Sequence, residues 1–310
     1  MPFISVVSPC YNEEGNVEEM ICRVSRVLEE LPGYDYEYIF IDNASTDTTL
    51  QILKRIARDD KRIKIIANTR NFGHNRSPYY ALLQAKGDAV IFLASDQQDP
   101  PEMIADFIKK WEEGYKVVLA VKTDSRETAA MFLVRKLYYD LINRLSDVEL
   151  VKNSTGFGLY DRRVIEIVRD TNDPYPYIRG LIAEIGFETA KIEYTQPARK
   201  RGISKNNFFT LYDLAMLGIT SHSKIPLRLA TMLGFSMSLL SLLAAMIYFV
   251  YKILFWQSFS VGVAPLVIGL FFFGSIQLFF LGIIGEYIGS IHTQVLRRPI
   301  VVEKERINFD

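Results

Sequence analysis

The chain has 310 residues, and its 36 Lys and Arg residues are balanced by 36 Asp and Glu residues, so the formal net charge is zero. Proteins that bind nucleic acid are usually basic, so this balance argues against that class, and no nucleic acid is expected as a partner. The two cysteines, Cys10 and Cys22, are too few for a disulfide framework. No signal peptide is expected, because residues 1–12 lack a basic region and their apolar run is short.

Apolar residues are unevenly distributed along the chain. Residues 1–223 have the mixed composition of a soluble domain, whereas residues 227–291 are almost purely apolar. Up to residue 121, short apolar runs alternate with segments of helical periodicity, which predicts an α/β fold with a mostly parallel sheet flanked by helices on both faces. The expected strands are 4–9, 36–41, 63–67, 89–94 and 116–121; the expected helices are 17–31, 48–58, one from the turn at 68–73 to about 85, and 102–112.

The next part of the chain gives weaker patterns. Residues 129–145 predict an amphipathic helix, residues 153–160 a loop that enters a strand, residues 162–169 a short helix and residues 189–195 a strand.

Polar loops follow the first, second and fourth expected strands. They are residues 11–16 (YNEEGN), 42–47 (DNASTD) and 95–99 (SDQQD). Ligands of parallel sheets bind outside the carboxyl ends of the strands, so these loops are expected to converge on one site. None has the glycine pattern of a dinucleotide fingerprint or a P-loop, so a metal and basic side chains must hold the phosphates of any nucleotide.

Asp96 and Gln98 are the candidate metal ligands. They lie two residues apart after an apolar strand, and an extended chain would send both side chains to the same side. Their hard oxygen atoms suit Mg²⁺ or Mn²⁺. The alternative is a strand followed by an ordinary Asp-Pro turn. Asp99 either supports the metal ligands or caps the helix that starts after Pro100.

Residues 199–205 (RKRGISK) form a basic loop. Four cations around one glycine predict an anion site, because glycine allows close backbone approach and arginine can bind phosphate with two hydrogen bonds. The alternative is a solvated basic loop that is attracted to anionic lipid.

The apolar C-terminal part predicts a membrane anchor. Residues 208–221 predict a helix in the membrane interface, or alternatively a packed core helix. Two uncharged stretches, about 229–251 and 261–285, each exceed the roughly 20 residues that cross a bilayer. Basic residues flank them and are missing from the connector 253–260, which places the large domain and both termini in the cytoplasm. The expected organisation is a domain at 1–205, an interfacial segment at 206–226, a transmembrane pair at 227–292 and a cytoplasmic tail at 293–310.

Several motifs occur together in one order: PCYNEE, RNFG, SDQQDPPE, the R-x-x-G-x-S-K loop and a transmembrane pair ending in GEYIG. Over essentially the whole chain this set resembles the bacterial polyisoprenyl-phosphate glycosyltransferases, relatives of dolichol-phosphate mannose synthase within the family 2 glycosyltransferases. The resemblance implies a GT-A fold. It also implies inverting transfer of a sugar from a nucleotide sugar, expected to be UDP-linked, to undecaprenyl or a similar lipid phosphate. Such a protein would lie in the inner membrane, serve cell-envelope glycans and form homo-oligomers, in some relatives tetramers.

The resemblance also implies roles for individual residues. Asp96 and Gln98 match the metal ligands, and Asp96, Arg199 and Lys205 are the expected catalytic residues. The expected nucleotide-sugar site comprises Pro9, Tyr11, Glu13, Asp42, Asn43, Arg70 with its neighbour Asn71, and Asp96. The phosphates of donor or acceptor are expected on Arg199, Arg201, Ser204 and Lys205.

The chain departs from the family pattern at several of these places. Ala94 and Asn43 replace usual carboxylates, which points to altered recognition of the base or ribose. No carboxylate lies near Gly156, Gly158 replaces an arginine, and His74-Asn75 replaces a Lys-Glu pair. One alternative is therefore a weakly active or inactive homologue that binds nucleotide or lipid and scaffolds an oligomer. Another is a processive polysaccharide synthase, which would usually need more spans.

Overall fold

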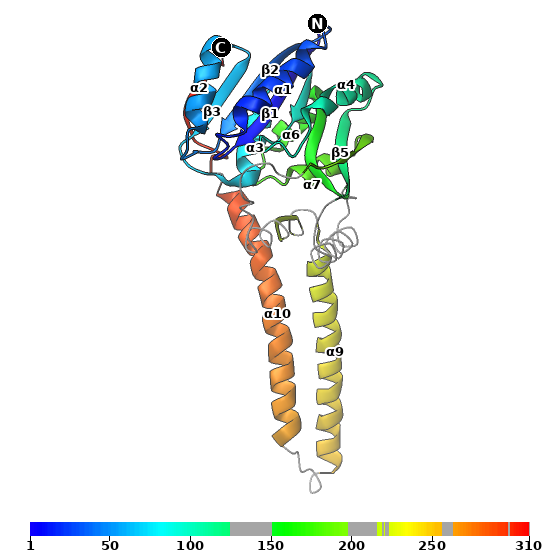
Figure 1. Ribbon diagram of the computed structural model, residues 1–310. Coiled ribbons are helices and arrows are strands. Elements are labelled where there is room, and N and C mark those ends of the chain that lie inside the picture. The colour runs from blue at the N-terminus through cyan, green and yellow to red at the C-terminus, as the bar shows by residue number, and fades with distance from the viewer. Residues whose placement is uncertain are drawn as a thin grey trace.

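The computed structural model describes residues 1–124, 151–197, 216–218, 220, 223–255, 263–296 and 298–309. The expected helix at 129–145, the basic loop at 199–205 and most of the expected interfacial helix at 208–221 lie outside these residues. Figure 1 shows an α/β domain from which two long helices extend side by side.

Eight strands form one mixed sheet in the described part of the chain, in the order β7-β5-β6-β4-β1-β2-β3-β8. Strands β4, β1, β2 and β3 run parallel, and β6 and β8 run antiparallel to their neighbours. The predicted α/β sheet is thus confirmed. The strands are β1 (Phe3–Cys10), β2 (Asp35–Asp42), β3 (Ile63–Asn68), β4 (Ala89–Phe92), β5 (Val117–Asp124), β6 (Ser154–Asp161), β7 (Thr189–Thr195) and β8 (Glu303–Ile307).

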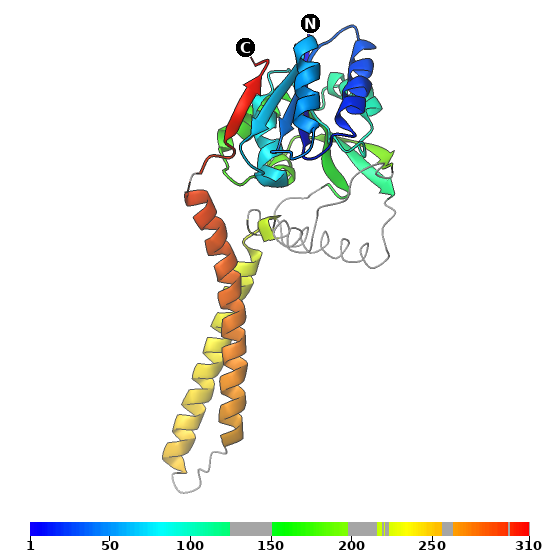
Figure 2. The ribbon, with the colours of Figure 1, turned by 60° about the vertical axis from the view of Figure 1, so that its left-hand side comes forward.

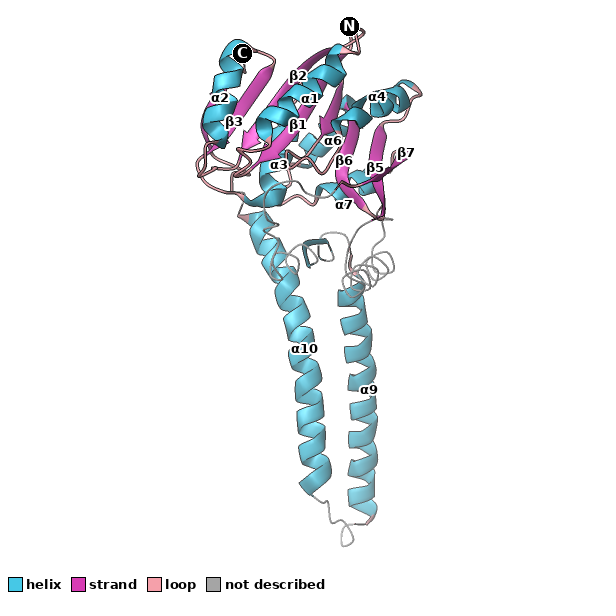
Figure 3. Cartoon of the chain, in the orientation of Figure 1, coloured by secondary structure: helices cyan, strands magenta, loops and turns pink. Residues whose placement is uncertain are grey.

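Helices cover both faces of the sheet, as predicted (Figure 3). Alternate residues of one strand face opposite sides: Val6 packs in the core under α1 (Val17–Glu29), α2 (Thr49–Asp59) and α4 (Ile104–Glu112), whereas Val7 packs in the other core. That second core lies under α3 (Gly73–Gln84), α6 (Arg162–Thr171) and α7 (Ile178–Ile185). A short helix, η1 (Pro101–Met103), precedes α4, and α7 is an element that the sequence analysis missed.

The two long helices are α9 (Ile225–Leu254) and α10 (Val263–Val295), and both are long and apolar enough to cross a membrane. No residue in the apolar window of either helix is buried, so neither is a core helix of the domain. The Tyr287 hydroxyl of α10 donates to the carbonyl of Ser223, just before α9, at 2.6 Å. Helix α10 therefore continues beyond the level at which α9 begins, and it ends ten residues after the expected end of the second span.

The C-terminal residues correct the expectation of a separate tail at 293–310. After α10 the chain returns to the domain, where β8 pairs antiparallel with β3 and closes that edge of the sheet (Figure 2). The backbone N–H of Thr69 donates to Val302 at 2.9 Å. The sequence EKERI lacks an apolar run because β8 is an edge strand. Its charges pair instead, Glu305 with Lys54 and Arg306 with Glu303.

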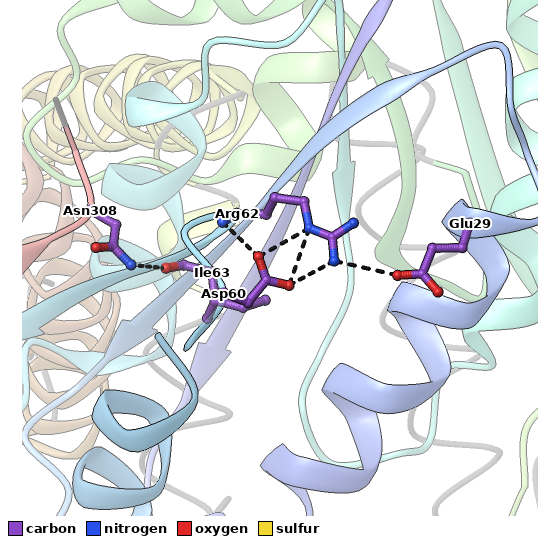
Figure 4. A network of polar contacts seen from close by, with 5 residues as sticks. All are labelled: Glu29, Asp60, Arg62, Ile63 and Asn308. Atoms are coloured by element: carbon purple, nitrogen blue, oxygen red, sulfur yellow. Dashed lines mark hydrogen bonds and ion pairs between the residues drawn. The ribbon is translucent and has the colours of Figure 1, made fainter. Parts of the chain in front are cut away.

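Asn308, just after β8, is hydrogen-bonded to the turn between α2 and β3. Its side-chain amide donates to the carbonyls of Ala57 (2.7 Å) and Ile63 (2.8 Å). Beside it, Arg62 binds Asp60 and Glu29, so one network joins the ends of α1, α2 and β8 (Figure 4).

We expect Asn308→Gly to lower the free energy of unfolding by about 1–2 kcal/mol, because the two bonds to backbone carbonyls and an exposed bond from Lys61 are lost. Glycine is the suitable replacement, since Asn308 has a φ of 62° that glycine adopts without strain. The melting temperature of the detergent-solubilised chain measures the effect. Asn153→Gly, at an exposed position with a φ of 59°, is the matched control. Equal melting temperatures for the two variants would contradict this role.

Candidate functional site

The loops at the carboxyl ends of β1 and β4 are joined by serine side chains. The Ser8 hydroxyl donates to the carbonyl of Leu93 at 2.6 Å, and the Ser95 hydroxyl donates to the carbonyl of Pro9 at 2.8 Å. Both serines are buried, so these bonds are protected from water. Pro9 and the 95–99 loop are therefore brought together, as predicted.

The loops after β1 and β2 are interlocked by a second set of hydrogen bonds. The backbone N–H of Asn12 donates to the Ser45 hydroxyl at 2.9 Å, and the Asn12 side-chain oxygen accepts from the Thr46 N–H at 2.7 Å. Glu14 accepts from both the N–H and the hydroxyl of Thr48. The three polar loops thus form one continuous edge, and Asn12 and Glu14 serve to hold it. Tyr11 and Glu13 are half-buried in the same loop, where Glu13 accepts from the Asn16 amide at 2.6 Å.

Asp42 is buried at the end of β2, with 1% of its surface exposed. Its carboxylate accepts from the backbone N–H of Ser45 at 3.2 and 3.4 Å. Burial raises the pKa of the Asp42 carboxyl above its ordinary value, whereas the hydrogen bonds from Ser45 act in the opposite direction. These contacts shape the turn at residues 42–45, in which Ala44 has a φ of 62°.

Asn43 joins this turn to the loop after β3. Its amide N–H₂ donates to Asn71 Oδ1 (2.9 Å) and to the carbonyl of Gly73 (3.2 Å). Its amide oxygen accepts from Asn68 (3.1 Å) and from the backbone N–H of Phe72 (2.9 Å). The two backbone partners fix the orientation of the amide, because a carbonyl only accepts and an N–H only donates.

The hydrogen-bonding capacity of Asn43 is therefore filled within the protein. That Asn43 binds the nucleotide sugar stays a prediction. A carboxylate could not make the two donated bonds, so the structure accounts for an amide at this position.

Arg70 lies on the loop that Asn43 anchors, so the structure brings it to the same edge. Its guanidinium is exposed, stacks over the Phe72 ring at 4.1 Å and donates to the carbonyl of Asn71 at 3.1 Å. The side chain is positioned by the aromatic ring and leaves most of its donors accessible.

The loop that carries Asp96 and Gln98 is a turn, which corrects the expectation of an extended chain. Strand β4 ends at Phe92, and Gln97 has a φ of 61°. Gln97 is buried, where it accepts from Arg23 at 3.4 Å and donates to the carbonyl of Asn16 at 3.5 Å. The neighbouring Asp96 and Gln98 stay half-buried, and the backbone N–H of Gln98 donates to Asp96 Oδ1 at 3.2 Å.

This donor set suits a hard divalent cation that keeps several water or phosphate ligands. It provides one carboxylate and one amide oxygen on a single turn, both partly open to solvent. The described residues contain no group of three or more His, Cys, Asp and Glu side chains arranged for a metal. A cation held here would thus take its remaining ligands from substrate and water. Ala94 is half-buried on this loop, and nothing in the structure explains the loss of a carboxylate there.

Asp99 turns inward from the same loop, and its contacts do not make it a helix cap. Its carboxylate accepts from the Tyr194 hydroxyl of β7 at 2.9 Å, and η1 has no side-chain cap. Burial raises the pKa of Asp99 to about 6, while the hydrogen bond from Tyr194 opposes the shift. Sequence reasoning missed Tyr194, because β7 carries no motif that points to the loop after β4.

The two glycines of β6 explain further departures from the family pattern. A Cβ at Gly158 would lie 2.1 Å from the carbonyl oxygen of Val118, so no arginine fits there on this backbone. Gly156 has a φ of +89°, which a side chain adopts only with strain. Close backbone packing thus requires glycine at 158, and backbone conformation favours glycine at 156. Arg199, Arg201, Ser204 and Lys205 lie outside the described residues, which stop at Pro197 after β7.

The family assignment follows from comparison with known proteins. The description "Glycosyl transferase family 2" matches residues 5–168, which hold β1 to β6 and the three interlocked loops. The chain belongs to glycosyl transferase family 2. Its α/β domain has the GT-A fold of that family.

Relatives of this family 2 chain extend over its full length. An uncharacterized glycosyltransferase of Bacillus subtilis, YkcC, is 35% identical over 99% of this chain and 94% of its own. The bactoprenol glucosyl transferase of Shigella phage SfII is 34% identical over 97% of each chain. Among solved structures, S. aureus TarS in complex with UDP is 20% identical with a TM-score of 0.44, over 72% of this chain and 66% of TarS.

We expect Asn43→Asp to destabilise the family 2 domain by about 2–3 kcal/mol at pH 8, because two donated bonds are lost and a charge is buried. The pKa of a buried carboxyl is raised in the folded state, so the loss should shrink as the pH falls to 5 and the acid is protonated. Melting temperatures at the two pH values measure this. Asn153→Asp, at an exposed site, should be nearly neutral. An equal loss at both pH values would refute the burial argument.

Proposed function

We propose that the chain transfers a sugar from a nucleotide sugar, UDP-linked, to a polyprenyl phosphate of the undecaprenyl type, with inversion. The observation that carries this proposal is the match to bactoprenol glucosyl transferases along the whole chain, including the two apolar helices. Such a lipid substrate lies in a membrane, and the family 2 domain stands at the ends of α9 and α10 (Figure 1).

The distribution of basic residues supports a family 2 domain on the cytoplasmic face of the inner membrane. Lys224 and Arg228 lie at the start of α9, and Arg298 follows α10, so these basic residues lie at the end of the helix pair that bears the domain. Arg297 precedes Arg298 in the sequence. The exposed apolar surfaces of α9 and α10 are suited to lipid and to other copies of the chain, and we include a homo-oligomer in the proposal.

The proposed reaction is a single displacement at the anomeric carbon of the sugar. A phosphate oxygen of the lipid forms the new bond to this carbon, while the bond to the β-phosphate oxygen of the nucleotide breaks and the diphosphate leaves with the electron pair. A phosphate monoester is largely dianionic at neutral pH and needs no base to remove a proton. The glycine at position 156, whose φ of +89° disfavours a side chain, is compatible with a reaction that needs no carboxylate base there.

The main demand on the protein is to stabilise the departing diphosphate. Asp96 and Gln98 would hold Mg²⁺ or Mn²⁺, and a bound ion supplies positive charge for the diphosphate. Arg199 and Lys205 are proposed to neutralise the remaining charge, with Arg201 and Ser204 binding phosphate beside them. Pro9, Tyr11, Glu13 and Arg70 are proposed to line the nucleotide, while Asp42 and Asn43 keep the loops in place.

The deciding experiment uses the full chain in detergent with Mn²⁺, labelled undecaprenyl phosphate and a panel of nucleotide sugars. The expected result is a glycolipid with at least one donor. A chain that binds a nucleotide sugar but forms no glycolipid with any donor would instead be an inactive binding homologue.

We expect Asp96→Ala to lower metal-dependent turnover by at least about 100-fold, since a ligand of the cation is removed. Recovery of the variant in the membrane fraction shows that insertion is intact. Asp106→Ala, which removes an exposed carboxylate from α4, should retain activity. Full turnover of the Asp96 variant would refute the metal assignment.

We expect Lys205→Ala to raise the KM for donor or lipid phosphate by about tenfold, because a charge-assisted contact is lost. Steady-state kinetics with each substrate varied in turn measure the effect. Lys191→Ala, an exposed lysine of β7, is the control. Unchanged kinetics would assign residues 199–205 to the lipid surface instead.

A further inference from the structure

A buried hydrogen bond joins the candidate metal loop to a distant strand. Asp99 and Tyr194 are 4% and 8% exposed, and the tyrosine hydroxyl donates to the Asp99 carboxylate at 2.9 Å. Asp99 follows β4 and Tyr194 belongs to β7, and in the sheet β5 and β6 lie between these two strands. The bond therefore ties together two parts of the sheet that do not pair with each other.

Packing holds the Tyr194 side of this bond in place. The Tyr194 ring packs edge-on against Phe157 at 5.9 Å, and Phe157 packs edge-on against Phe107 of α4 at 4.9 Å. The Thr123 hydroxyl of β5 donates to the carbonyl of Tyr194 at 3.2 Å, and Lys122 donates to Gln196 at 2.7 Å. The end of β7, Thr195, is thus fixed four residues before Arg199 in the sequence.

Contacts of neighbouring residues hold the Asp99 side. The Ser95 hydroxyl donates to the carbonyl of Pro9 at 2.8 Å, and the buried Gln97 donates to the carbonyl of Asn16 at 3.5 Å. Asp96 and Gln98 lie between Ser95 and Asp99 in this loop. Because Asp99 is buried, movement of the loop would break a bond that is shielded from water.

We propose that Asp99 and Tyr194 are positioning residues, which fix the loop that carries Asp96 and Gln98 relative to the end of β7. This inference rests on the proposed function, in which Asp96 and Gln98 and the cations that follow β7 act on the same diphosphate. Neither Asp99 nor Tyr194 needs to touch substrate. Their effect is to keep the loop of Asp96 and Gln98 at one separation from the end of β7.

Three variants of the full chain in detergent test the proposal. Tyr194→Phe removes only the hydroxyl, and Asp99→Ala removes the acceptor. Asp99→Asn keeps an oxygen that can still accept from the tyrosine. Tyr79→Phe is the matched control, because its hydroxyl is also buried and donates to the carbonyl of Val168 at 3.0 Å, on the other face of the sheet.

Two measurements are made on each variant: hydrogen–deuterium exchange of the peptide that covers residues 93–100, and the Kd for Mn²⁺ in the presence of UDP. For Tyr194→Phe and Asp99→Ala we expect exchange to speed up by about fivefold, because one buried bond is lost. The Kd should rise by about tenfold, as for other residues that orient metal ligands. Asp99→Asn and Tyr79→Phe should stay within about twofold of the wild type in both measurements.

Two results would overturn the proposal. One is an exchange rate of residues 93–100 in Tyr194→Phe that equals the wild-type rate. The other is an Asp99→Asn variant that behaves like Asp99→Ala, because the charge of Asp99 rather than its hydrogen bond with Tyr194 would then matter. If the wild type binds neither Mn²⁺ nor UDP, the proposed function fails, and the exchange data still decide whether the pair positions the loop.

Discussion

The common direction of β4, β1, β2 and β3 is the constraint on which the candidate site depends. Parallel strands end at one edge of a sheet, so loops that are far apart in sequence meet there. Neighbouring loops then share buried or interlocking hydrogen bonds, from Ser8 and Ser95 on one side to Asn12 and Asn43 on the other. The site is rigid before any ligand binds, and this reduces the entropy that binding must overcome.

Several polar residues of this edge hold the loops together through their side chains. Asn43 uses its whole amide on the 68–73 turn, and Asp42 turns its carboxylate to Ser45. Gln97 is buried between Arg23 and Asn16, although it stands between the two candidate metal ligands. A short motif therefore mixes side chains that face solvent with side chains that support the backbone, and sequence alone does not separate the two kinds.

The sequence predicted the elements whose signal is local. The predicted bounds of β7 agree with the observed ones, and the predicted ends of α1, α2 and α4 lie close to the observed ends. In the helices, apolar residues repeat with the helical period. Strand β8 was missed because an edge strand with paired charges shows no such period. The bond between Asp99 and Tyr194 joins residues 95 positions apart, and no local pattern encodes it. An extended chain was predicted at Asp96, where the structure has a turn. No residue pattern in the sequence marks the end of β4 at Phe92.

Strand β8 also imposes an order on the synthesis of the molecule. The ribosome makes β1 to β7 first, then the apolar helices α9 and α10, and only afterwards the five residues that cover the edge of β3. Until then, that edge exposes unpaired backbone groups, which invite association with other chains. A nascent chain paused within α10 therefore carries an open sheet edge and an apolar segment together. Pairing of β8 with β3 then removes the exposed sheet edge.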